Sequence, residues 1–137
     1  MKKYWITALL TVIAIFAIVG TIAAVSANTN GTLALNAADS GKQITVNAGD
    51  SFTLTLDSNV TTGFSWSNAS ISNASVLQET SHEYITPPTP RIGQGGHEKW
   101  TFKALAEGTN TISMNYSRSW ETGVAPAATF NVTIVVQ

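Results

Sequence analysis

The residue types that perform catalysis or bind metals are sparse in this chain and do not occur at productive spacings. The 137 residues include two histidines, His82 and His97, no cysteine, and scattered carboxylates. A zinc site needs three or four converging His, Cys or carboxylate ligands. The stretch 63–67, Gly-Phe-Ser-Trp-Ser, lacks the final glycine of the nucleophile elbow found in serine hydrolases. We therefore expect no enzymatic activity, no bound metal and no cofactor.

Residues suited to binding occur instead in three short stretches, of which the first is Asn-Val-Thr-Thr-Gly. It follows Ser51–Asp57, where polar and apolar residues alternate as in a half-buried strand. The glycine can adopt a positive φ angle and lets the chain reverse its direction. Phe64 and Trp66 then resume the alternation, so the pattern predicts a strand, an exposed polar tip and a second strand, as in a hairpin. The candidate binding residues of this tip are Asn59, Val60, Thr61, Thr62 and Gly63.

The second stretch has three glycines in four residues and follows a proline-rich segment at 87–90. Prolines lack the backbone N–H that a sheet requires, which places the segment in a loop. Glycine backbone without side-chain bulk can lie close against a partner, although a flexible loop tip would have the same composition. The candidate residues are Gly93, Gln94, Gly95 and Gly96.

The third stretch is Arg118, Ser119 and Trp120, at the end of a predicted strand. Arginine and tryptophan are enriched among the residues that dominate the free energy of protein–protein binding. The alternative is that Trp120 covers the end of the hydrophobic core with the Arg118 guanidinium stacked on it. Composition alone leaves both interpretations open.

The segments that hold these stretches have the two-residue period of β-strands, and no segment after residue 27 has a helical period. Seven or eight short strands with turn signals between them are typical of an antiparallel sandwich of the immunoglobulin type, here without a disulfide. We expect strands at 42–47, 51–57, 64–66, 76–86, 97–104, 110–117 and 129–137, with a further short one at 32–35.

The N-terminal segment 1–27 has the pattern of a signal peptide or a membrane anchor. Lys2 and Lys3 precede an uncharged apolar run, Ile6–Val25, which small residues follow at a plausible cleavage site. The run is also just long enough to span a bilayer, which takes about 20 residues. Either outcome predicts a domain that is secreted or tethered on the extracytoplasmic face of the membrane. We expect a polar linker at 28–41 and one folded domain at 42–137.

The charge balance excludes one class of partner. The formal net charge is −1 and only 11% of the residues are charged. Nucleic-acid binding needs clustered Lys and Arg to neutralise phosphates, and no such cluster exists. We therefore expect no nucleic-acid partner, and contact with a membrane only through an uncleaved N-terminal segment.

The three stretches, taken in order, resemble the chagasin family of cysteine-protease inhibitors over roughly 42–137. That family has Asn-Pro-Thr-Thr-Gly before an aromatic-x-Trp strand, Gly-x-Gly-Gly after prolines, and Arg-Pro-Trp. The resemblance implies an immunoglobulin-like monomer whose loops wedge, reversibly and non-covalently, into the cleft of papain-like, cathepsin L-like proteases. It implies that Thr61 and Thr62 approach the catalytic cysteine and histidine, with the glycines clasping one side and Arg118 and Trp120 the other. The alternative is an exported adhesion or carbohydrate-binding module of the same fold.

This chain departs from the family pattern at two prolines, which are replaced by Val60 and Ser119. Each replacement is expected to cost about 0.4–1 kcal/mol of preorganisation, because proline restricts the unbound loop. The first also turns Asn59-Val60-Thr61 into an acceptor sequon for N-glycosylation. A glycan there would prevent entry into a protease cleft, whereas glycans at Asn68 or Asn73 would be tolerated.

Overall fold

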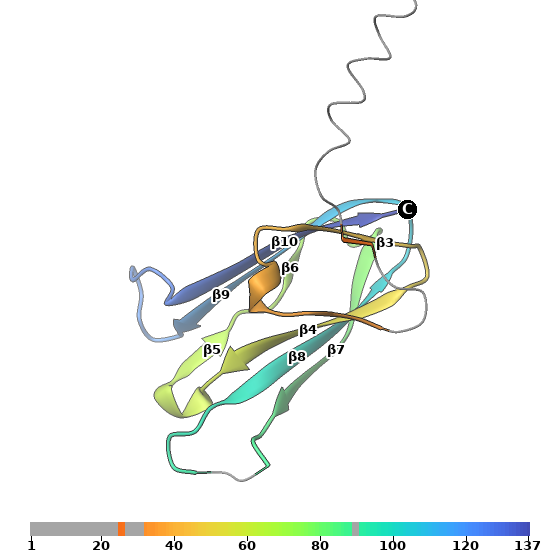
Figure 1. The fold of residues 1–137 in the computed structure, drawn as a ribbon. Coiled ribbons are helices and arrows are strands. Elements are labelled where there is room, and N and C mark those ends of the chain that lie inside the picture. Colours follow the sequence, from red (N-terminus) through yellow and green to blue (C-terminus); the bar gives the residue numbers. More distant parts are fainter. Residues whose placement is uncertain (1–24, 27–31, 89–90) are drawn as a thin grey trace, which may run out of the picture.

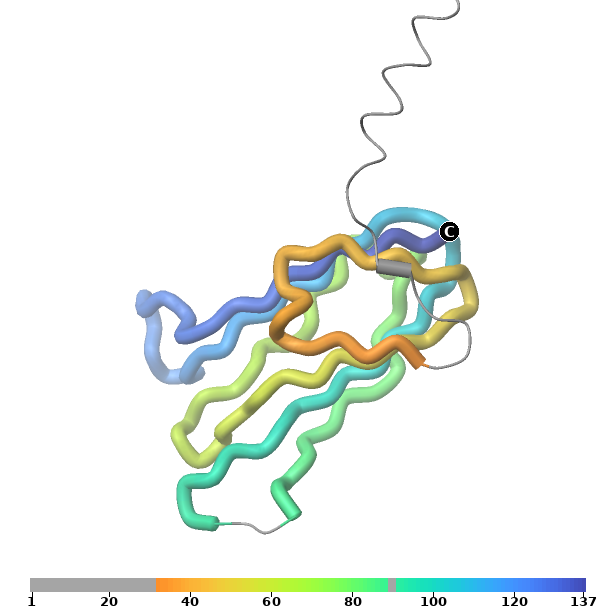
Figure 2. The backbone as a smooth tube through the Cα atoms, in the orientation of Figure 1, coloured from red at the N-terminus to blue at the C-terminus, as the bar shows by residue number. Residues whose placement is uncertain are grey.

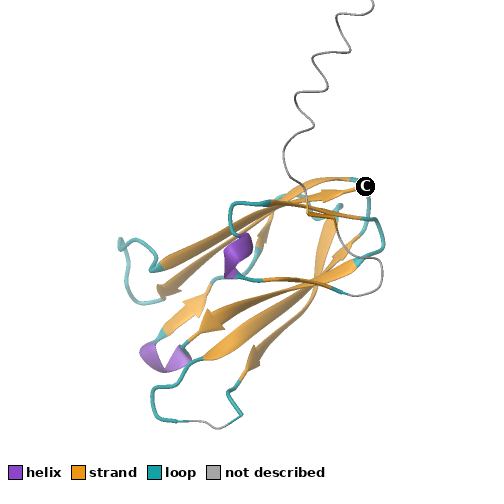
Figure 3. Cartoon of the chain, viewed as in Figure 1, coloured by secondary structure: helices purple, strands orange, loops and turns teal. Residues whose placement is uncertain are grey.

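The fold is a sandwich of two β-sheets, and the computed structural model describes residues 25–26, 32–88 and 91–137 of it (Figure 1). The six-stranded sheet contains β1 (Val25–Ser26), β3 (Gln43–Val46), β10 (Ala128–Val136), β9 (Gly108–Arg118) and β5 (Phe64–Trp66) in that order, with β6 (Ser70–Ile71) also paired to β9. The four-stranded sheet contains β2 (Leu33–Leu35), β4 (Ser51–Ser58), β8 (Gly96–Ala104) and β7 (Leu77–Ile85) in that order. Two short 3₁₀ helices, η1 (Ala37–Asp39) and η2 (Val60–Thr62), lie between strands (Figure 3).

The predicted immunoglobulin-like sandwich is confirmed, and the eight strands of three or more residues match the predicted number. The long strands pair in antiparallel fashion, β4 with β8, β8 with β7, and β9 with β10. The first strands pair in parallel instead, β2 with β4 and β3 with β10. They do so because the N-terminal part of the domain passes from one sheet to the other through η1 rather than through a hairpin.

The predicted boundary at Lys42 needs a correction. Leu33–Leu35, the short strand expected within the predicted linker, pairs with β4, and Leu35 is buried in the core. The folded part therefore begins before Lys42. Val25–Ser26, assigned to the N-terminal segment, pairs with β3, and residues 1–24 lie outside the described part. Within the described residues, no helix has the length and apolar character needed to cross a membrane.

The core fills the space between the sheets, as the alternating pattern of the strands requires. Every second residue is buried in β4, and also in β10 from Phe130 onward, which is the burial pattern of strands with one solvated face. Phe52 and Phe102 stack across the two central strands of the four-stranded sheet with ring centroids 5.4 Å apart. Each fully buried side chain of this size contributes about 1.5–3 kcal/mol relative to an exposed one. The sandwich is thus a rigid base for the loops at its ends.

Strand register brings three connections to one end of the sandwich, opposite the C-terminus (Figure 2). Ser58, the last residue of β4, pairs with Gly96, the first residue of β8. Phe64, the first residue of β5, pairs with Arg118, the last residue of β9. The connections after β4, before β8 and after β9 therefore emerge at neighbouring points. The stretch around η2 is not a hairpin, because β4 and β5 belong to different sheets.

Candidate functional site

Three loops form the candidate site: the first loop (59–63), the second loop (86–95, without 89–90, which are outside the described part) and the third loop (119–127). All twelve sequence-predicted site residues lie in these loops or at the strand ends beside them. The exceptions to a loop position are Gly96, the first residue of β8, and Arg118, the last residue of β9. The fold thus brings together stretches whose first residues, Asn59, Gly93 and Arg118, are 25 to 59 residues apart in the chain.

Asn59 connects the first loop to its surroundings on two sides. Its backbone N–H donates to the hydroxyl of Tyr116 at 2.8 Å, and its side-chain amide donates to the carbonyl of Gly93 at 3.1 Å. Its side-chain oxygen accepts from the Thr61 hydroxyl at 2.6 Å. One asparagine therefore couples the first loop to β9 and to the second loop, which gives it a positioning role.

The tip of the first loop is a single turn of 3₁₀ helix that Gly63 closes. Gly63 has φ 81° and ψ −4°, the left-handed conformation that the sequence predicted for it. The hydroxyl of Thr62 donates to the carbonyl of Asn59 at 2.6 Å, and both threonine side chains are exposed. The two threonine hydroxyls therefore form hydrogen bonds within the first loop, and these bonds stabilise the shape of the loop.

Trp120 joins the third loop to the first. A β-carbon at Gly63 would overlap the six-membered ring of the Trp120 indole, so only glycine permits this contact. The Trp120 side chain is 66% exposed and is not part of the hydrophobic core. Of the two interpretations that composition left open, the geometry favours an exposed binding residue over a cover for the core.

Arg118 also connects the first loop and the third loop. Its Nε donates to the carbonyl of Thr62 at 3.0 Å, and its guanidinium pairs with Glu121 at 2.9 Å. The guanidinium also lies 4.2 Å from the centroid of the Phe64 ring, closer than the 6.0 Å to Trp120. Cation–π contacts of this kind contribute about 0.5–1 kcal/mol at exposed sites. The charge is thus largely occupied by internal partners.

The three glycines of the second stretch have different structural roles. Gly93 has φ 80° and lies in a turn that the N–H of Gln94 closes by donating to the carbonyl of Arg91 at 3.0 Å. A β-carbon at Gly95 would lie 3.1 Å from the β-carbon of Asn59, and one at Gly96 would overlap the Ile85 carbonyl. Gly96 is buried, so it packs against β7 rather than facing outward.

Sequence reasoning missed two tyrosines that support the loops. Tyr116 accepts the Asn59 N–H, and its ring stacks on Phe64 at 5.3 Å. The Tyr84 hydroxyl accepts from the Gly96 N–H at 3.0 Å and donates to the Ser58 carbonyl at 3.3 Å. The only signal in the sequence was that both tyrosines fall near the ends of predicted strands, where a polar hydroxyl can reach a loop.

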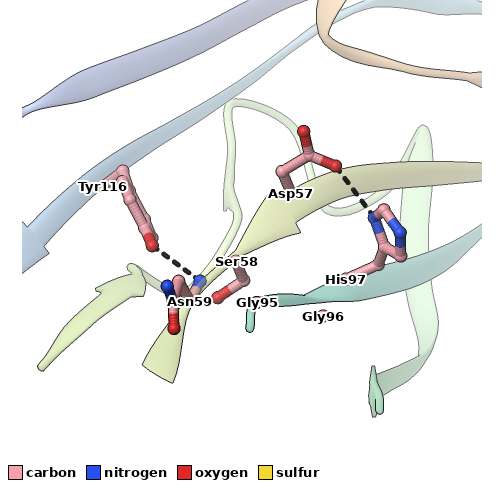
Figure 4. Close-up of a pocket in the computed structure, with 7 residues that line it drawn as sticks. All are labelled: Asp57, Ser58, Asn59, Gly95, Gly96, His97 and Tyr116. Atoms are coloured by element: carbon pink, nitrogen blue, oxygen red, sulfur yellow. Dashed lines mark hydrogen bonds and ion pairs between the residues drawn. The ribbon is translucent and has the colours of Figure 1, made fainter. Parts of the chain in front are cut away.

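A shallow pocket of about 370 Å³ lies between the first and second loops (Figure 4). The Nδ1 atom of His97 lies 2.9 Å from a side-chain oxygen of Asp57 there, on the outer face of the four-stranded sheet. Ser58 is the next residue of β4 and is buried on the opposite face, and its hydroxyl has no partner within the described residues. Serine, histidine and aspartate therefore line one pocket without the geometry of a catalytic triad.

Exposed apolar side chains concentrate at the loop end of the molecule. Val60 in the first loop is 49% exposed, Ile92 in the second is fully exposed, and Trp120 and Val124 in the third are 66% and 60% exposed. Of the other three large exposed apolar residues described, Tyr84 and Ile85 end β7 beside the second loop. Clustered exposed apolar residues mark interaction sites. Sequence reasoning found Val60 and Trp120 but not Ile92 and Val124.

Known proteins share both the sequence pattern and the fold. The profile of the family described as "Chagasin family peptidase inhibitor I42" matches residues 45–134. Chagasin from Trypanosoma cruzi is 30% identical over 86 residues, which cover 61% of this chain and 78% of chagasin.

Two solved structures are similar in fold. The cysteine protease inhibitor EhICP2 from Entamoeba histolytica superposes with a TM-score of 0.70 at 23% identity, covering 77% of this chain and 96% of that one. PbICP-C, solved in complex with falcipain-2, superposes with a TM-score of 0.56 at 14% identity, covering 83% of this chain and 98% of that one. At these sequence identities, the similarity to the two structures shows that the fold is shared.

Proposed function

Because the chain belongs to the chagasin family of peptidase inhibitors, we propose that it is a reversible, non-covalent inhibitor of papain-like cysteine proteases. The observation that carries the proposal is the cluster of exposed apolar side chains on three loops, of which the first is bonded to the second and is bonded by Arg118, beside the third. EhICP2 is a cysteine protease inhibitor, and PbICP-C was solved with falcipain-2. The alternative of an adhesion or carbohydrate-binding module has no support in these comparisons.

The mechanism is occlusion of the active-site cleft by a preformed wedge. Thr61 and Thr62 at the tip enter the cleft. The segment from Gly93 to Gly95 borders one wall, and Trp120 with Ser119 borders the other, supported by the bond from Arg118 to the first loop. The tip is wound as a 3₁₀ turn, so it does not present an extended peptide for nucleophilic attack. The protease thus binds the loops without cleaving them.

Preorganisation lowers the entropic cost of binding through these loops. Ordering a flexible loop on binding costs about 0.5–1.5 kcal/mol for each immobilised side chain. Here Asn59, Arg118 and the Trp120–Gly63 contact hold the three loops together in the free protein. Much of that entropic cost is therefore met when the protein folds. On binding, burial of the exposed apolar side chains then contributes favourable free energy.

We further propose that the domain is a monomer acting outside the cytoplasm, either secreted or tethered by segment 1–27. Lys2 and Lys3 before an apolar run support export with the N-terminus inside. Val25 pairs with Ile44, and Ile44 pairs with Ile134 of β10. Ile134 lies six residues after Ala128, the residue of β10 at the loop end, so the two are about 20 Å apart along the strand. A tether would therefore join the domain far from the loops and leave them directed away from the membrane.

An inhibition assay tests the proposal. The purified protein is added in increasing amounts to papain, and hydrolysis of a chromogenic peptide is followed, with trypsin as the control protease. The proposal predicts complete loss of papain activity near equimolar ratio, no effect on trypsin and an inhibitor of unchanged mass afterwards. Undiminished papain activity at micromolar protein, or steady cleavage of the protein, would refute it.

A further inference from the structure

The described part of the chain contains four exposed acceptor sequons for N-glycosylation apart from the one at Asn59. The sequence Asn-x-Ser/Thr, with x other than proline, begins at Asn68, Asn73, Asn115 and Asn131. All four asparagines are exposed. A sequon alone is a weak signal, so what matters is where the fold places these side chains.

The four asparagines gather on one sheet of the sandwich. Asn115 in β9 and Asn131 in β10 occupy outward positions of the six-stranded sheet, where Asn131 pairs with Ser113. Asn68 and Asn73 flank β6, which pairs with β9 at the edge of the same sheet. The four-stranded sheet carries no sequon among its described residues.

The side-chain amide nitrogens of these four residues are available. Asn131 and Asn73 use their side-chain oxygens to accept hydrogen bonds from Ser113 and Ser75, and no hydrogen bond from any of the four amide nitrogens occurs within the described part. Asn59 differs, because its amide nitrogen donates to Gly93 across the site. Four asparagines of the sequons therefore have free amide nitrogens, whereas the amide nitrogen of Asn59 is hydrogen-bonded to the second loop.

The surface around the four acceptors is polar yet uncharged. None of the outward positions of β3, β5, β6, β9 and β10 carries a charge, and all but one bear a hydroxyl or amide: Gln43, Thr45, Ser65, Ser70, Thr109, Thr111, Ser113, Asn115, Ser117, Thr129, Asn131, Thr133 and the exception Val135. The outer face of the four-stranded sheet instead carries the charged residues Lys99, Lys103 and Asp57. Only 11% of the residues in the whole chain are charged, against about 25% in ordinary domains. The outer face of the six-stranded sheet therefore lacks the charges that usually keep a protein surface soluble.

We propose that the outer face and β6 edge of the six-stranded sheet are a glycan-bearing surface, modified at Asn68, Asn73, Asn115 and Asn131. The donor is an oligosaccharide linked to a lipid phosphate or pyrophosphate. The asparagine amide nitrogen forms a bond to the anomeric carbon of the first sugar, the bond from that carbon to the phosphate oxygen breaks, and the amide loses one proton while the lipid phosphate departs. No oxidation or reduction is involved.

The arrangement keeps the loops free. Glycans are bulky and solubilising, and those on the six-stranded sheet stand on a face of the sandwich rather than at its loop end. A glycan on Asn59 would instead be attached to the amide nitrogen that donates to Gly93, and it would stand beside Thr61. The proposal rests on the export proposed above, but it is independent of protease inhibition.

Mass mapping of the full-length protein from its native cells tests this surface. The peptides that contain the five asparagines are measured for added sugar mass. Ser117→Ala and Thr133→Ala remove two sequons without changing an asparagine, and each is expected to lower the intact mass by one glycan. Asn47→Gln, at an exposed asparagine outside any sequon, is the control that leaves the sugar mass unchanged.

Sugar on at least two of the four outward asparagines, with Asn59 unmodified, would support the proposal. Unmodified peptides at three or all four of them, or occupancy of Asn59 equal to theirs, would overturn it. Because the readout is mass, a protein that carries these glycans and fails to inhibit papain would refute the proposed function and leave this proposal standing.

Discussion

The indole ring of Trp120 occupies the place that a β-carbon of residue 63 would take. The indole therefore keeps this position over the first loop only if residue 63 is glycine. The same residue needs the left-handed backbone conformation that glycine adopts most readily. Two independent requirements thus meet at Gly63, one for the shape of the first loop and one for the position of Trp120.

Gly63→Ala is expected to weaken papain inhibition at least tenfold, because the new methyl group displaces Trp120. The left-handed backbone adds about 1–2 kcal/mol of strain. Gly49→Ala is the matched control, since Gly49 has φ 93° and nothing within 4 Å of its β-position. Thermal melts and inhibition constants of both variants are compared. An equal loss of inhibition in the two variants would contradict the Trp120 contact.

Trp120→Ala is expected to reduce the free energy of binding by about 2 kcal/mol or more, as for other central aromatic residues of interfaces. The melting temperature should hardly change, because Trp120 is 66% exposed. Trp100→Ala, at a fully buried position of β8, should destabilise the fold by about 3–5 kcal/mol instead. A Trp120 variant that unfolds early and binds normally would restore the interpretation of this residue as a core cover.

Asn59→Ala removes the bond between the first and second loops and the acceptor of the Thr61 hydroxyl. A hydrogen bond contributes about 0.5–1.5 kcal/mol net, so the loss of two predicts a roughly tenfold weaker inhibitor. Asn68→Ala, at an exposed residue outside the loops, serves as the control. The comparison uses inhibition constants of unglycosylated protein, and equal constants for the two variants would rule out the positioning role of Asn59.

The double variant Val60→Pro with Ser119→Pro is expected to bind up to about ten times more tightly, since each proline restricts the free loop. Val60 is the first residue of η2, a position that favours proline. Arg118 to Glu121 form a turn in which the Glu121 N–H donates to the Arg118 carbonyl at 3.2 Å. Ser119 is the second residue of this turn, a position where proline is also favoured. Weaker binding by a folded double variant would show that the bound loops need another conformation.

The sandwich was predictable because it depends on local patterns, whereas the meeting of the three candidate loops was an implication of the family resemblance. Alternation in Ser51–Asp57 specifies a half-buried strand wherever the chain later places it. The positive φ of Gly63 also follows from its place in a tight turn. The short strand β2 was anticipated, but its membership of the sheet was not, since burial of Leu35 depends on contacts with β4 that are distant in sequence.

The connections among the loops were not predictable, because they join residues far apart in the chain. Nothing in the local sequence indicates that Asn59 donates to Gly93, or that Tyr116 accepts its backbone N–H. The hairpin expected at 59–63 was wrong for the same reason. The turn is local, but the partner of β5 is β9 rather than β4, and that choice is made by the packing of the whole sandwich.

Binding of the protein to papain with an open and with a filled cleft tests the central claim most directly. One papain sample is left active, and the other is treated with a peptidyl epoxide that attaches to the catalytic cysteine and fills the cleft. Wedge occlusion predicts tight one-to-one binding to active papain, and affinity for the filled enzyme at least a hundredfold lower. Equal affinity for both samples would mean that the loops bind elsewhere and would contradict the account.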